Sequence, residues 1–217
     1  MRQWVLIAFL IGVALPGSAS AGSLPPFDEA GHDPGFKRFR AQFLEIVQKR
    51  DLSSLEKHLH PNIRMSLGNG RGIPAAVRIM RNEPSRWKIL EQVLRGGGKF
   101  KTFSTADGPE RMFFAPYTYF AELGDGDSPF EIAVVTGENV NVRATPSRTA
   151  RVIKQLSNWV VHVPSPIIDE KPWIKIRIPQ GSTGYVHASH IARPTDFRAG
   201  FEMHEGNWKL RVFLAGD

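Results

Sequence analysis

Hydrophobic and polar positions divide the chain into regions of different periodicity. Residues 4–15 are an almost unbroken apolar run. Residues 34–120 first repeat apolar side chains at the spacing of helices and then alternate as strands do. Residues 131–193 contain only short apolar runs separated by turn residues. The pattern predicts a hydrophobic leader, then an α+β unit, then an all-β unit.

The helices of the α+β unit have clear start signals. Asp33 is a good N-cap residue, and Pro34 suits the first helical position, so a helix is predicted from there to about Arg50. Ser53 and Glu56 have the spacing of a capping box and predict a second, short helix. Two further helices are expected, and they cover residues 74–80 and 85–95.

Strands are predicted where the apolar spacing changes to alternation. In the α+β unit the expected strands cover residues 63–67, 100–103, 112–115 and 117–120. Residues 121–130 are polar, contain Gly and Pro, and read as a linker. In the all-β unit the expected strands cover residues 132–135, 140–143, 151–156, 159–163, 173–178 and 183–187. So many short strands predict a small closed barrel, because closure leaves no open sheet edge.

The last segment, residues 196–217, reads as a β-hairpin with one apolar face. The residues of that face alternate along the second strand, and they are Trp208, Leu210, Val212 and Leu214. A barrel that is complete near Arg193 has no place for this hairpin. We therefore expect the hairpin to complete the sheet of the α+β unit at residues 34–120, with the barrel inserted before it.

Residues 131–193 also carry ordered motifs. The segment Val140-Asn141-Val142-Arg143, followed by Pro146-Ser147, resembles the opening of bacterial SH3-like domains. Residues 173–176 and 184–191 resemble the later strands of the same family. The resemblance implies an SH3-like barrel that contacts cell-envelope components, either peptidoglycan or an envelope protein. It also implies a surface groove, for which the candidate ligand-binding residues are Asn141, Arg143, Trp173 and Tyr185.

The remaining part of the chain has a second family resemblance. A helix-first unit that closes with a hairpin, and the motif Gly206-Asn207-Trp208 within that hairpin, are similar to the nuclear-transport-factor-2-like (NTF2-like) cone fold. This resemblance implies helices over a curved antiparallel sheet that surrounds a pocket. The expected fold class is therefore α+β with an inserted all-β barrel.

The amino terminus has the three parts of a secretory signal peptide. Arg2 supplies a positive charge, the apolar run follows, and Ala19-Ser20-Ala21 supplies the small residues of a cleavage site. We expect residues 1–21 to be removed, the mature chain to begin at Gly22, and the protein to be exported to the periplasm or secreted. The alternative is an uncleaved membrane anchor, although the apolar run is shorter than the roughly 20 residues that a spanning helix needs.

Composition narrows the possible partners. The sequence has no cysteine, so folding rests on the core without disulfides. The formal net charge is +7 and the basic residues are spread along the chain, which favours anionic partners outside the cytoplasm over nucleic acid.

The chemistry-bearing residues show no familiar catalytic arrangement. There is no cysteine nucleophile, no Gly-x-Ser-x-Gly elbow and no His-Glu-x-x-His motif. The pairs His58/His60 and His187/His190 lack the further ligands that a metal site needs. We expect neither metal nor cofactor, and a non-catalytic binding protein of the cell envelope. Two alternatives are a small-ligand carrier or enzyme that uses a pocket in the α+β unit, and a structural adaptor for another envelope protein.

Overall fold

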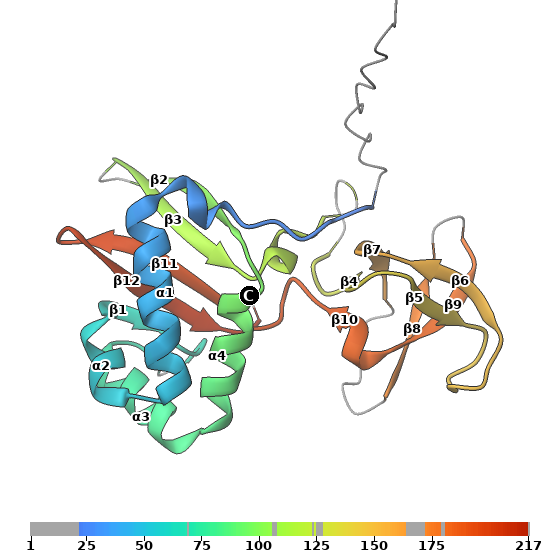
Figure 1. The fold of residues 1–217 in the computed structure, drawn as a ribbon, viewed down its shortest axis with the longest axis horizontal. Helices are drawn as coiled ribbons and strands as arrows, with labels where there is room; N and C mark the ends of the chain where they lie inside the picture. The colour runs from blue at the N-terminus through green and yellow to red at the C-terminus, as the bar shows by residue number, and fades with distance from the viewer. Residues whose placement is uncertain are drawn as a thin grey trace, which may run out of the picture.

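The computed structural model describes residues 22–68, 70–105, 108–122, 124, 128–163, 172–178 and 181–216. The predicted signal peptide lies outside these residues. Figure 1 shows two units side by side, one with helices packed on a sheet and one made of strands. Among the described residues, no helix is both long enough and apolar enough to cross a membrane.

Four α-helices pack against the first sheet, the first and the last across one face and the middle two beside one edge (Figure 1). They are α1 (Pro34–Lys49), α2 (Leu52–Lys57), α3 (Ile73–Asn82) and α4 (Ser85–Arg95). The predicted start of α1 is confirmed, because the Asp33 carboxylate accepts a hydrogen bond from the backbone N–H of Phe36 at 2.9 Å. The capping box predicted at Ser53 is wrong. Asp51 caps α2 instead, with its carboxylate 3.0 Å from the backbone nitrogen of Ser54.

The first sheet has the strand order β1-β12-β11-β3-β2. Its strands are β1 (Leu59–Arg64), β2 (Lys99–Thr105), β3 (Gly108–Ala115), β11 (Arg198–His204) and β12 (Asn207–Leu214). The C-terminal hairpin thus lies within the sheet of the helical unit. Because β12 pairs parallel with β1, the sheet is mixed. The prediction of a purely antiparallel sheet is therefore wrong. A parallel pair needs a long crossover, which the chain between these two strands supplies.

Two strand predictions in this unit are wrong. The first strand begins at Leu59 and not at Ile63, because Leu59 pairs with Leu210 of the returning hairpin. Residues 117–120 form the 3₁₀ helix η2 (Tyr117–Phe120) and not a strand. Pro116 precedes η2 and has no N–H to donate to a sheet ladder, which explains the end of β3.

Aromatic side chains fill the space between the helices and the sheet. Phe36 and Phe43 of α1 are fully buried, as are Phe113 of β3 and Phe201 of β11. The rings of Phe36 and Phe113 lie 4.4 Å apart between centroids. This interior is therefore a packed core, and a ligand site must be sought at its margins.

A β-bulge changes which residues of β12 reach the core. Phe201 pairs with Leu210 but Gly200 pairs with Val212, so one extra residue, Arg211, stands in β12. As a result Phe213 is fully buried while Val212, predicted on the apolar face, is only half-buried.

The second unit is a seven-stranded antiparallel sheet of order β10-β4-β7-β8-β9-β5-β6. Its strands are β4 (Ile132–Val135), β5 (Val140–Arg143), β6 (Val152–Leu156), β7 (Trp159–His162), β8 (Trp173–Arg177), β9 (Thr183–His187) and β10 (Ile191–Ala192). The sheet has two edges, β10 and β6, and no pairing between them occurs among the described residues. The closed SH3-like barrel expected from the sequence is therefore not shown.

Residues 22–28 form a bridging segment that joins the two units (Figure 1). In the second unit, the backbone N–H of Leu24 donates to the carbonyl of Asn158 at 2.7 Å. In the first unit, the carbonyl of Phe27 accepts from the N–H of Gly98 at 2.9 Å. Gly98 must be glycine, because a Cβ there would lie 2.0 Å from the carbonyl oxygen of Phe114.

Candidate functional site

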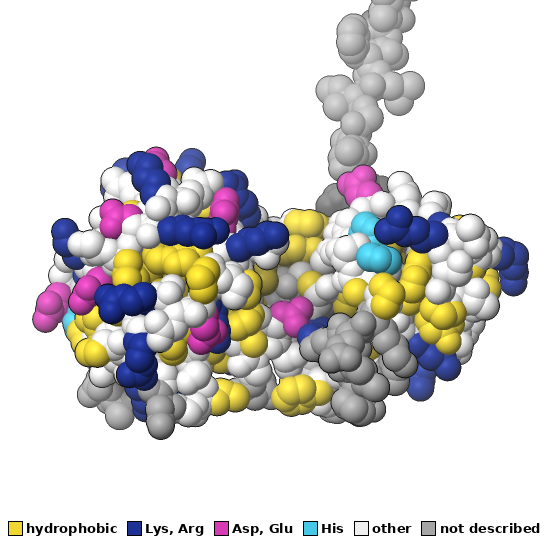
Figure 2. Space-filling model, turned by 90° about the horizontal axis from the view of Figure 1, so that it is seen from below, with side chains coloured by type: hydrophobic (Ala, Val, Ile, Leu, Met, Phe, Trp, Pro, Cys, Tyr) yellow, Lys and Arg dark blue, Asp and Glu magenta, His cyan; other side chains and the backbone are white. Residues whose placement is uncertain are grey.

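A cavity with largely apolar walls lies where the two units meet. This junction pocket has a volume of about 560 Å³ and is formed by α4, η2, the segment after β10 and the end of β12. Figure 2 shows apolar side chains in the hollow between the two lobes, with basic side chains spread over both. The lining residues of the junction pocket are Ile89, Gln92, Val93, Pro116, Thr118, Ala192, Arg193, Asp196, Phe197 and Ala215.

The apolar wall of the junction pocket is held in place by ring contacts. The ring of Phe197 lies 5.3 Å from the buried ring of Phe213, measured between centroids. The guanidinium of Arg86 lies 4.6 Å from the centroid of the Phe197 ring, a cation–π contact. With contacts to core and helix, Phe197 presents a fixed apolar surface to the pocket.

A small number of polar groups interrupt this wall. The Asp196 carboxylate accepts from the backbone N–H of Arg193 at 2.8 Å and from its Nε at 3.0 Å. Thr118 is buried and Gln92 lies on α4. The junction pocket thus combines apolar walls with one guanidinium–carboxylate pair, which can orient a polar group of a ligand.

A second unusual site is the carboxylate cluster on the sheet face opposite the helices. It consists of His60, Glu110, Glu202, His204 and Arg211, from four strands of the first sheet. His60 and Glu202 are each only 6% exposed, and the Nε2 of His60 lies 2.7 Å from the Oε1 of Glu202. The Nε of Arg211 lies 3.3 Å from the same oxygen. Two titratable side chains are thus buried in direct contact.

The hydrogen bonds fix the protonation of His60. Its Nδ1 accepts from the backbone N–H of Asn62 at 2.9 Å, so the ring proton must be on Nε2, which donates to Glu202. Burial lowers the pKa of His60 to about 4, and the nearby Arg211 charge acts in the same direction. His60 is therefore neutral at neutral pH.

Glu202 is shifted in the opposite direction. Burial raises the pKa of Glu202 to about 8, and a hydrogen bond to the carboxyl group of Glu110 adds to the shift. Glu202 therefore carries a proton near neutral pH. Perturbed titratable groups of this kind are frequent at functional sites.

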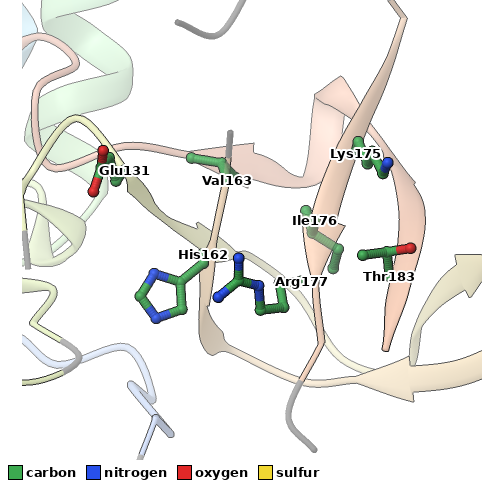
Figure 3. Close-up of a pocket in the computed structure, with 7 residues that line it drawn as sticks. All are labelled: Glu131, His162, Val163, Lys175, Ile176, Arg177 and Thr183. Atoms are coloured by element: carbon green, nitrogen blue, oxygen red, sulfur yellow. The ribbon is translucent and has the colours of Figure 1, made fainter. Parts of the chain in front are cut away.

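A third cavity, of about 430 Å³, lies in the second sheet between β7 and β8. Figure 3 shows the side chain of Arg177 extending toward His162, whose ring points away from Arg177. Residues 164–171, which connect these two strands along the chain, lie outside the described residues, so no site is assigned to this cavity.

The four ligand-binding candidates from the sequence lie on neighbouring strands of the second sheet. Arg143 of β5 pairs with Tyr185 of β9, and Trp173 of β8 lies on the other side of β9. The Arg143 guanidinium donates to the carbonyl of Ala150, and the Asn141 side chain accepts from Gln155. None of the four lines the junction pocket. Their role in binding stays a prediction.

Sequence reasoning missed both the junction pocket and the carboxylate cluster. His60 was considered only as a metal ligand, and within the described part of the chain no group of three or more His, Cys, Asp or Glu side chains is arranged to hold a metal ion. The available signal for Glu202 was its position between the apolar residues Phe201 and Met203 of a predicted strand.

No protein-family model and no curated protein matches the sequence. Seven chains of solved structures match. Aln2 from a Streptomyces species has 9% identity and a TM-score of 0.33, over 88% of this chain and 93% of its own. An NTF2-like protein with a cystatin-like fold from Novosphingobium aromaticivorans has 9% identity and a TM-score of 0.30, over 83% and 77%. An NTF2-like protein from Shewanella oneidensis has 10% identity and a TM-score of 0.29, over 83% and 96%.

The structure corrects the predicted function. The described residues of the second unit form a sheet with two edges and no closed barrel. The largely apolar pocket and the perturbed His60–Glu202 pair are both built mainly from the α+β unit. The expectation that the protein works by contacting peptidoglycan or an envelope protein through a barrel is therefore wrong. A pocket in the α+β unit, the alternative raised from the sequence, fits better.

Proposed function

We propose that the protein is a non-catalytic carrier that holds a small, largely apolar molecule in the junction pocket. The observation that carries the proposal is the pocket itself. Its volume of about 560 Å³ falls within the range of small-molecule sites, roughly 300–1,000 Å³. Apolar walls with few polar groups are the usual lining of such sites.

The lining defines the class of ligand. Most of it is apolar, from Ile89 and Val93 on one side to Phe197 and Ala215 on the other, so burial of an apolar body supplies the affinity. The ion pair between Arg193 and Asp196 is the charged part of this lining. We expect the ligand to carry one polar group that reaches this pair.

The proposal is tested with the apolar fluorescent probe 8-anilinonaphthalene-1-sulfonate, whose emission rises in an apolar site. The half-buried Ile89 is replaced by Trp, which fills the pocket from its α4 wall. The matched control is Lys88→Trp, on the adjacent exposed position of the same helix. We expect saturable binding to the wild-type protein and to the control, and a loss of about tenfold or more in affinity for Ile89→Trp. Equal affinity for all three proteins contradicts the proposal.

We also propose that the second sheet is an SH3-like module. Strands β5, β8 and β9 contain the motifs that resemble SH3-like domains, and β4, β5 and β9 have the predicted bounds. This module forms one side of the junction pocket, because Ala192 and Arg193 at its end belong to the pocket lining.

We also propose that the protein is exported after removal of residues 1–21, on the basis of their charge, apolar run and small-residue site. Gly22 would then be the first residue, and its carbonyl accepts from the backbone N–H of Val160 at 2.6 Å. Amino-terminal sequencing of the protein recovered from outside the cytoplasm is expected to begin at Gly22. Recovery of the chain in the cytoplasm with Met1 at its start contradicts export.

A further inference from the structure

The geometry points to a second binding site, and we propose that it takes a small organic anion through a carboxylate or phosphate group. This rim pocket, of about 570 Å³, lies between the first half of α1, the end of α2 and the β11–β12 hairpin. It shares no residue with the junction pocket. Its lining includes Asp33, Gly35, Arg38, Phe39, Lys57, Met203, Trp208 and Lys209.

The charge of the rim pocket favours an anion. Arg38, Lys57 and Lys209 contribute three positive side chains to its lining, and Asp33 is the acidic one. The negative charge of Asp33 is already engaged, because its Oδ1 accepts from the Phe36 N–H and its Oδ2 lies 3.1 Å from Arg111. The Phe36 N–H also lowers the pKa of Asp33, so the carboxylate stays ionised as a helix cap.

A buried donor without a partner supplies independent support. The indole Nε1 of Trp208 is buried and has no hydrogen-bond partner among the described residues, and the side chain is only 7% exposed. A Cβ on Gly35 would lie 3.9 Å from this nitrogen, so the indole nitrogen lies next to Gly35, which also lines the pocket. An unsatisfied buried donor is costly, and a ligand oxygen that reaches it removes that cost.

The same cavity offers surface for an apolar body. Phe39 is half-buried in the lining, and Met203 is 51% exposed, although it is a large apolar residue. A flat organic acid can place its ring against these two side chains and its carboxylate toward Lys57 and Trp208. The site therefore selects for an anion with an apolar part, and it differs in charge from the site of the proposed carrier function.

The test uses the full protein labelled with ¹⁵N and follows the indole N–H signals of its tryptophans by NMR. The Trp208 signal is assigned by its loss in Trp208→Phe. Benzoate and inorganic phosphate are the probes, benzamide is the uncharged analogue, and sodium chloride sets the ionic strength. We expect a saturable shift of the Trp208 signal with benzoate, and a weaker one with phosphate. No saturable shift with either probe, or an equal shift with benzamide or chloride, overturns the proposal.

Two variants and a control separate a specific site from general attraction. Lys57→Ala is expected to weaken benzoate binding about fivefold, while Lys88→Ala, an exposed lysine on α4, leaves it unchanged. Gly35→Ala adds a methyl group 3.9 Å from the indole nitrogen and 3.2 Å from the Asp33 carboxylate, so it narrows the site and is expected to weaken benzoate binding in a folded protein. Equal weakening by Lys57→Ala and Lys88→Ala also contradicts the site.

Discussion

Two residues of the carboxylate cluster, His60 and Glu202, have large pKa shifts in opposite directions. His60 is held neutral by burial and by the N–H of Asn62, and Glu202 is held protonated by burial and by Glu110. Near neutral pH the contact between His60 and Glu202 is therefore a hydrogen bond between two uncharged groups. Their opposite pKa shifts give the stability of the protein a distinctive dependence on pH.

Between pH 6.5 and pH 8 we expect the free energy of unfolding to fall as pH rises. Glu202 has a pKa raised from 4.5 to about 8, so its contribution is fully present below pH 4.5 and is lost as pH rises through 8. His60 has a pKa lowered from 6.5 to about 4, so its contribution is present above pH 6.5 and is lost as pH falls toward 4. Above pH 6.5 the contribution of His60 no longer changes with pH, so Glu202 determines how the free energy of unfolding changes.

Urea unfolding at pH 6.5 and pH 8 measures this slope in the wild type and in Glu202→Gln. The glutamine cannot ionise, so the free energy of unfolding of the variant should differ much less between the two pH values than that of the wild type. Glu205→Gln, an exposed position in the same hairpin, serves as the control and should keep it. A slope that is the same in Glu202→Gln and in the wild type would show that Glu202 is ionised in the folded protein.

The residues of this cluster could not be assigned from the sequence. The cap role of Asp33 was predictable, because a cap acts on residues two or three places further along the chain. The burial of Glu202 depends on His60 and Arg211, which reach it through β1 and β12. Contacts between such distant segments leave no local pattern, so an isolated Glu in a strand reads as a solvent-facing residue.

At the scale of elements, α1 organises the first unit, since its buried face carries Phe36 and Phe43. Replacing its cap, Asp33→Ala, should lower the free energy of unfolding by about 1 kcal/mol, because the Phe36 N–H loses its acceptor. Asp33→Asn keeps an acceptor but not the charge beside Arg111. Its free energy of unfolding should therefore lie between those of the wild type and Asp33→Ala. Chemical denaturation of the three proteins checks this order. Equal stabilities would mean that water satisfies the helix end as well as the carboxylate does.

The elements themselves were largely predictable, while their register was not. Helical spacing located α1 and α4, and turn residues located β4, β5 and β9. Strict alternation along β12 failed at Val212, because the bulge at Arg211 depends on how β11 pairs with it. No local pattern indicated that β1 would pair with a strand from the other end of the chain.

For the whole molecule, the bridging segment fixes how the two units are joined. Its residue Leu24 packs on a small apolar cluster of the second unit, and Phe27 is bound to Gly98 of the first. Leu24→Asp should therefore weaken the coupling of the units and split thermal unfolding into two transitions in differential scanning calorimetry. Pro25→Asp, at the adjacent exposed position, is the control and should keep the wild-type profile. A single unchanged transition in Leu24→Asp would contradict a coupling role.

The two-unit organisation was visible in the sequence, but the junction pocket was not. Its walls come from α4, from η2, from the segment after β10 and from Ala215 near the end of the chain. Only the pairing of the C-terminal hairpin with β3 and β1 brings these segments together. A cavity of this kind is a property of the whole fold, so it has no sequence motif.

The most direct measurement of the carrier function is the set of intermolecular NOEs between the aromatic protons of bound 8-anilinonaphthalene-1-sulfonate and the methyl groups of the full protein. The junction pocket predicts NOEs to Ile89, Val93 and Ala215, which line it from two different parts of the chain. The exposed Val152 of the second sheet provides a methyl reference outside the pocket lining. NOEs confined to Val152 and its neighbours, with none to the three pocket residues, would contradict the proposed function.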